Sequence, residues 1–125
     1  MAGKIIADQI EHSTAGSIAT NYVVEGSAKA WVNYTSNTTT SIRDSLNTSS
    51  LSDVSTGKTI VTFSNAMANA NYSCPTACSN GDAGSTACSL DPHTFVTGST
   101  KFNSFANASL ADRNFNMVSF LGDLA

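Results

Sequence analysis

The amino-acid sequence predicts an all-β fold, a small antiparallel β-sandwich or barrel-like module. Turn-forming residues recur about every ten positions, and no stretch carries a sustained helical apolar stripe. Ser (19), Thr (15) and Asn (12) together make up more than a third of the 125 residues. Their short polar side chains compete for helical backbone hydrogen bonds and favour strands and turns. Short strands separated by regular turns are typical of sandwiches and barrels.

Three segments define the strands most clearly. Residues 28–34 alternate, with apolar side chains at the even positions for the core and Lys29, Trp31 and Asn33 on the opposite face. A turn at residues 55–58 precedes an apolar run at 59–63, which predicts a hairpin. Residues 114–121 are apolar on both faces, as in a buried central strand. Further expected elements are a turn at 35–40 and strands at 42–46, 94–97 and 101–105.

Two segments have a different character. Residues 1–27 contain Ile5, Ile6 and Ile10, whose spacing fits either a helical turn or a strand. The segment is too small to bury these side chains, so we expect it to pack on neighbouring chains or on a partner. Residues 74–92 almost lack large apolar side chains and predict a long surface loop, or a loop containing a weak hairpin.

Size and charge restrict the class of protein. A chain of 125 residues and 13.0 kDa fits one domain. The net charge is −3 and the six Lys and Arg are scattered, which argues against nucleic-acid binding. Leu, Ile, Val and Phe number only 25. Such a thin core favours a homo-oligomer, because subunit contacts add buried area.

No export or membrane segment is evident in the sequence. No apolar run approaches the roughly 20 residues that span a bilayer, and the first residues lack the roughly 7–15-residue apolar stretch of a signal peptide. We therefore expect synthesis in a cytoplasm and no membrane insertion. The five Asn-x-Ser/Thr sequons exceed the chance number of about three only slightly, so glycosylation is not expected.

The cysteines leave three alternatives open. Cys74, Cys78, Cys88 and His93 are the ligand types of a zinc site, but their spacing lacks the two close pairs of structural zinc sites. A disulfide between Cys74 and Cys78, or between Cys78 and Cys88, is the second alternative. An odd number of cysteines in a cytoplasmic protein favours the third, free thiols in a polar loop.

The sequence gives no support for catalysis. His12 and His93 are the only histidines, and the acidic residues are isolated. No nucleophile motif or phosphate-binding glycine loop is present. We expect no enzyme and no catalytic, cofactor-binding or metal-binding residue. Four aromatic residues form a potential sugar-stacking platform, although core or subunit contact is the favoured interpretation. They are Tyr22, Trp31, Tyr34 and Tyr72.

Several segments resemble a module of tail-fibre proteins from tailed phages of the marine and cyanobacterial type. The most specific is the Lys-Ala-Trp-Val-Asn run at residues 29–33, and the likeness covers about residues 28–73 and 114–124. Ala28–Tyr34, Ser41–Asn47, Thr59–Phe63, Ala66–Tyr72 and Asn116–Asp123 carry it. Similar proteins are homotrimeric virion parts that bind a host surface through loops and attach to the particle through short N-terminal segments. The cysteine-containing loop departs from that pattern.

The resemblance implies a trimeric fibre or fibre-tip protein in the virion tail, made in the host cytoplasm. Residues 1–27 would attach to another virion protein and join the subunits, and residues 28–125 would form the distal β module. The loop at residues 75–92 lies outside the resemblance, but its turn-forming composition on a β scaffold makes it the expected place of contact with a host-surface glycan or an outer-membrane receptor. A purely structural virion component, such as a capsid decoration or baseplate-connecting protein, and a carbohydrate-binding module are the alternatives.

Overall fold

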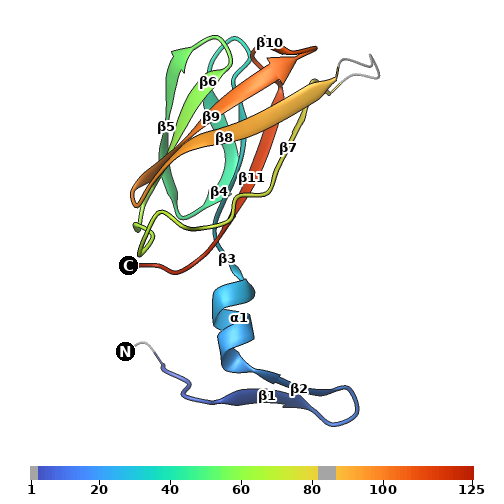
Figure 1. Cartoon of the computed structure of the whole chain (residues 1–125), viewed down its shortest axis with the longest axis vertical. Coiled ribbons are helices and arrows are strands. Elements are labelled where there is room, and N and C mark those ends of the chain that lie inside the picture. Colours follow the sequence, from blue (N-terminus) through green and yellow to red (C-terminus); the bar gives the residue numbers. More distant parts are fainter. Residues whose placement is uncertain (1–2, 82–86) are drawn as a thin grey trace.

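The computed structural model describes residues 3–81 and 87–125. It confirms the all-β class: antiparallel strands dominate, and the described residues contain one short helix. A slender N-terminal part leads into a larger globular part (Figure 1). The elements are β1 (Gln9–His12), β2 (Gly16–Ala19), α1 (Thr20–Gly26), β3 (Ala28–Thr35), β4 (Ser41–Leu46), β5 (Thr48–Ser55), β6 (Lys58–Phe63), β7 (Thr76–Ser79), β8 (Cys88–Val96), β9 (Ser99–Ala106), β10 (Ser109–Leu110) and β11 (Phe115–Leu121).

The N-terminal part, residues 3–27, is called the stalk below. It consists of the β1–β2 hairpin followed directly by α1, which connects the hairpin to the globular part (Figure 1). The Thr20 amide and hydroxyl donate to the carbonyls of Asp8 (2.9 Å) and Ala7 (2.7 Å), so the start of α1 is fixed to the chain before β1. Of the two interpretations of the isoleucine spacing, a helical turn or a strand, the strand is correct for Ile10, which lies in β1. The sequence did not predict α1.

Two antiparallel sheets make up the globular part. One has the order β4–β3–β11–β7. In the other sheet β9 is central. β8 pairs along one edge of β9, whereas β6 and β10 pair with different parts of the opposite edge of β9. β5 pairs with the free edge of β6. The hairpin predicted at residues 55–58 is confirmed as the β5–β6 turn.

The core lies between these sheets and centres on Phe120 of β11. Its ring is 4.8 Å from that of Phe63 on β6 and 6.1 Å from that of Phe102 on β9, both edge-to-face. Three of the four residues predicted on the core face of β3, Ala30, Val32 and Tyr34, are buried, whereas Ala28 at the start of the strand is exposed. Aromatic rings therefore supply much of the buried volume that the few aliphatic residues cannot.

Two expectations about the globular part were wrong in detail. β11 is central but buried on one face only, because Met117 on its outer face is 38% exposed. Residues 74–92 are not one long loop: residues 76–79 form β7, which pairs with β11, and residues 88–92 belong to β8, which pairs with β9 and buries Leu90. Their polar sequence suits edge strands, which need few apolar side chains. Residues 82–86, which belong to the predicted loop, lie outside the described residues.

No helix in the described ranges is long and apolar enough to cross a membrane. The C terminus lies at the end of the globular part next to α1, whereas the β5–β6 turn and β10 lie at the opposite end (Figure 1). The molecule therefore has a stalk end and a distal end.

Candidate functional site

The stalk exposes several large aliphatic side chains close together. Ile5 is 94% exposed and Ile6 is 83% exposed, and both are large aliphatic side chains. With residues of β1 and α1 they line an open groove of about 510 Å³. Such contiguous patches mark interaction surfaces. The main lining residues are Ile5, Ile6, Ile10, Thr20, Val23 and Val24.

Neither element of the stalk is expected to be stable by itself. α1 has seven residues, none of them buried, whereas isolated helices shorter than about 12–15 residues are marginal in water. A lone two-stranded hairpin such as β1–β2 is also marginal. The Lys29 ammonium donates to the carbonyls of Val24 and Ser27 at the end of α1, which supplies a local C-terminal cap. We infer that the stalk needs contact with another chain to persist as an ordered element.

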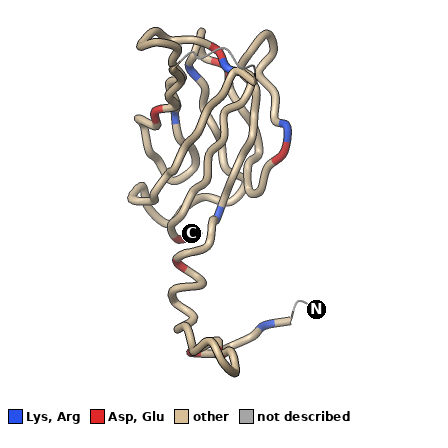
Figure 2. The backbone as a smooth tube through the Cα atoms, turned by 90° about the vertical axis from the view of Figure 1, so that its right-hand side faces the viewer, with Lys and Arg blue, Asp and Glu red and all other residues tan. Residues whose placement is uncertain are grey.

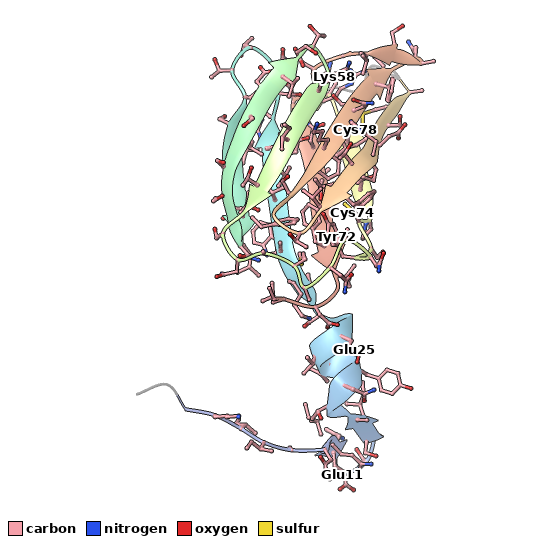
Figure 3. All side chains as sticks on the ribbon, turned by 60° about the vertical axis from the view of Figure 1, so that its left-hand side comes forward. Glu11, Glu25, Lys58, Tyr72, Cys74 and Cys78 are labelled. Atoms are coloured by element: carbon pink, nitrogen blue, oxygen red, sulfur yellow. A yellow bond between two sulfur atoms is a disulfide. The ribbon has the colours of Figure 1, made fainter. Side chains whose placement is uncertain are left out.

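Charge contributes little to this surface. Acidic and basic residues are few and spread over the whole chain, as Figure 2 shows. Lys4 is the one charged residue among those lining the stalk groove. Glu11 on the hairpin and Glu25 on α1 are both exposed (Figure 3). The groove therefore fits an apolar partner surface, whose binding depends weakly on salt because it does not rest on ion pairs.

The structure corrects the favoured interpretation of the cysteines. Cys78 of β7 and Cys88 of β8 form a disulfide, with their Cα atoms 6.0 Å apart, so these two are not free thiols. The pairing also removes two of the four candidate zinc ligands. Sheet formation explains it, because β7 and β8 become edge strands of the two facing sheets. Among the described residues, no group of three or more His, Cys, Asp or Glu is arranged to hold a metal ion.

The third cysteine has a different environment. Cys74 is a free cysteine that packs, half-buried, against the core. Burial raises the pKa of its thiol to about 12, because the thiolate loses solvation. Since the thiolate is the reactive form, Cys74 is expected to be a poor nucleophile in the folded protein.

Alkylation with iodoacetamide tests this arrangement. In air-oxidised protein without reductant, we expect one label per chain in denaturant, at Cys74, and three after reduction. In the folded state at pH 8, labelling of Cys74 should be at least about tenfold slower than in denaturant. Mass spectrometry of tryptic peptides measures both quantities. Three labels before reduction would contradict the Cys78–Cys88 pairing.

The four aromatic residues considered as a potential sugar-stacking platform do not come together. Tyr34 and Tyr72 are buried, and burial raises the pKa of both hydroxyls. The Tyr72 hydroxyl lies 2.6 Å from the Thr100 hydroxyl, inside the core (Figure 3). Tyr22 is 68% exposed on α1. Trp31 alone lies on the outer face of the β4–β3–β11–β7 sheet, half-buried in a second groove.

The two histidines are separate. His12 ends β1, and its Nδ1 accepts hydrogen bonds from the backbone amides of Thr14 and Ala15 in the hairpin turn, a structural role. His93 is exposed on β8, with its Nδ1 3.0 Å from the Thr94 hydroxyl. The structure thus brings neither histidine into contact with the other.

No protein-family model matches this chain, and no curated protein or solved structure matches it either.

Proposed function

We propose that the chain is a homotrimeric phage tail-fibre or fibre-tip protein, part of the virion, that contacts the host cell surface. The observation that carries this proposal is the exposed apolar stalk. A segment that cannot bury Ile5, Ile6 and Ile10 within its own chain requires other chains around it. The stalk, with residues 1–2, joins the subunits and attaches them to a neighbouring virion protein, and residues 28–125 form a β-sandwich module at the distal end.

The separation of the two ends of the molecule also supports a fibre role. The stalk projects from one end of the globular part, and compact turns lie at the other (Figure 1). Three copies joined by their stalks would present three sets of distal turns, so weak contacts with a host surface would add through multivalency. The resemblance of residues 28–73 and 114–124 to tail-fibre modules agrees with this arrangement.

The structure narrows the segment proposed for host contact. Much of residues 75–92 belongs to β7 and β8, and these strands support the sheets. Between them lies a connection at residues 80–87, and the disulfide joins the strands just before and after it. Part of that connection, residues 82–86, lies outside the described residues. We propose that this connection, residues 80–87, takes part in host contact.

Light scattering tests the role of the stalk. We expect the full chain to form a trimer of about 39 kDa, three times the 13.0 kDa chain, at micromolar concentration and in 0.1 M and 1 M NaCl alike. A truncated chain of residues 28–125 should fold, because the whole core lies within it, yet remain monomeric.

A substitution provides the matched comparison. Replacing both Ile5 and Ile6 by Ser should weaken trimer formation, whereas replacing the exposed Val54 of β5 by Ser should not. A full chain that is a stable folded monomer would overturn the trimer proposal. A trimer that assembles into the particle without affecting adsorption would favour a purely structural virion component. A trimer that never joins a particle would overturn the virion role altogether.

A further inference from the structure

The outer face of the β4–β3–β11–β7 sheet contains a groove of about 450 Å³, separate from the stalk. Strand register defines its floor. Trp31 of β3 lies opposite Ser119 of β11, and Asn33 of β3 lies opposite Met117. Met117 in turn lies opposite Ala77 of β7, and the Ser119 amide donates to the Pro75 carbonyl at 3.1 Å. Three strands therefore place an indole, a thioether, a carboxamide and a hydroxyl around one hollow.

The chemistry of this lining is neutral. None of the residues that line the groove carries a charge. A volume of 450 Å³ falls within the roughly 300–1,000 Å³ range of small-ligand sites. The groove therefore favours a small neutral ligand with an apolar face.

Asn33 adds a requirement for hydrogen bonding. Its Oδ1 is buried and accepts no hydrogen bond within the described residues. A buried carboxamide oxygen without a donor is unfavourable, and most such atoms in folded proteins are paired. The carboxamide can present an acceptor and two donors, and the Ser119 hydroxyl can act as either. The Asn33 Oδ1 is closed to solvent, so hydroxyl groups of a ligand would pair with this side chain through its amide hydrogens and with the Ser119 hydroxyl directly.

We propose that this groove binds a neutral pyranose sugar. One face of a pyranose ring presents C–H bonds, which pack against the electron-rich face of an indole such as that of Trp31. Its hydroxyl groups lie at the ring edge, where Asn33 and Ser119 can pair with them. A second copy of the chain fits less well where it offers aliphatic side chains, which are exposed on both the stalk and the globular part, because such side chains cannot form hydrogen bonds with Asn33 or Ser119.

This inference rests on the proposed function in that it names the class of host-surface molecule. It adds a second location, because it assigns saccharide binding to the side of the globular part, whereas the proposed function places host contact at the distal turns and at the connection of residues 80–87. A saccharide-binding side face and a trimeric stalk are independent features, so each can fail without the other.

Trp31 is the single tryptophan of the chain, so its fluorescence reports directly on the groove. The full chain is titrated with the methyl pyranosides of glucose, mannose and galactose, with N-acetylglucosamine and, as the charged counterpart, with glucuronic acid. We expect a saturable emission shift with at least one neutral sugar and binding of glucuronic acid at least about tenfold weaker. No shift with any neutral sugar at 50 mM overturns the proposal.

The binding site is located by measuring the affinity of each variant for the sugar by calorimetry, and a melting curve verifies that each variant is folded. W31A should abolish binding and N33A should weaken it about tenfold. Y22A removes an exposed aromatic side chain of the stalk and should leave the affinity unchanged. If W31A binds as tightly as the unmodified chain, the groove is not the site and the proposal fails. If the emission changes with protein concentration but not with sugar, a second copy covers the groove, which also overturns the proposal.

The oligomeric state separates the two proposals. A trimer that binds none of the sugars retains the proposed function and removes this inference. A monomer that binds a neutral sugar through Trp31 retains the inference and removes the trimeric fibre.

Discussion

Replacing Phe120 by Ala is expected to lower the free energy of unfolding by about 3–5 kcal/mol. Phe120 is fully buried, and its ring meets those of Phe63, Tyr72 and Phe102 edge-to-face. The substitution removes the ring that joins Phe63 of β6 and Phe102 of β9 to Tyr72. The cavity cannot close easily, because the surrounding strands are fixed by their ladders. Urea denaturation followed by circular dichroism measures the loss.

Phe115 provides a matched control on the same strand. Its side chain lies on the outer face of β11, half-buried, with the Arg43 guanidinium 4.3 Å from the ring centroid. Phe115→Ala should cost about 1–2 kcal/mol, since the lost contact is partly solvated. Equal losses for the two variants would show that the core does not centre on Phe120.

The sequence predicts those elements whose signal is local. Residues 28–34 alternate, and β3 buries Ala30, Val32 and Tyr34 as that pattern predicts, although Ala28 at the start of the strand is exposed. The β5–β6 turn was predictable because Gly57 stands between two runs of strand formers. In both cases the information lies within ten residues of the element, so no knowledge of distant partners is needed.

Elements that depend on distant partners were not predictable in this way. β7 has four residues and little apolar character, and it exists because it pairs with β11, which begins almost forty positions later. The same pairing places Cys78 near Cys88, so the disulfide could not be chosen over its alternatives from spacing alone. Met117 resembles a core residue in the sequence, but in the described part of the chain no layer covers the outer face of β11, and Met117 is 38% exposed.

Of the two candidate surfaces, the stalk depends on local sequence and the outer-face groove depends on distant strand partners. The apolar stalk could be anticipated, because Ile5, Ile6 and Ile10 occur where too few neighbours exist to bury them. The outer-face groove could not be predicted, because Pro75 and Ala77 lie near Trp31 only as a result of the strand order of the sheet. Composition shows which side chains a segment cannot bury, but it does not show which distant residues line the same groove.

Replacing Gly57 by Ala is expected to lower the free energy of unfolding by about 2–4 kcal/mol. Gly57 has φ +69°, a left-handed conformation that is unfavourable for residues with a Cβ. An added Cβ would lie 2.7 Å from both the Ala111 nitrogen and the Ser104 oxygen, which are backbone atoms and cannot rotate away. The neighbouring bonds would be strained, because the Gly57 amide donates to Asp112 Oδ1 and its carbonyl accepts from the Ser104 amide, both at 2.7 Å.

Gly98 in the β8–β9 turn gives the comparison for this variant. A Cβ at Gly98 would meet nothing within 4 Å, so Gly98→Ala should change stability by less than about 1 kcal/mol. The Gly57 variant should also loosen the distal end specifically, because its contacts tie the β5–β6 turn to the β9–β10 region. Hydrogen exchange should therefore show faster exchange at the amides of Ser104 and Ala111, while that of Ser119 in the outer-face groove keeps its protection. Stability losses of the same size for both glycine variants would show that close backbone contact at Gly57 does not hold the distal end together.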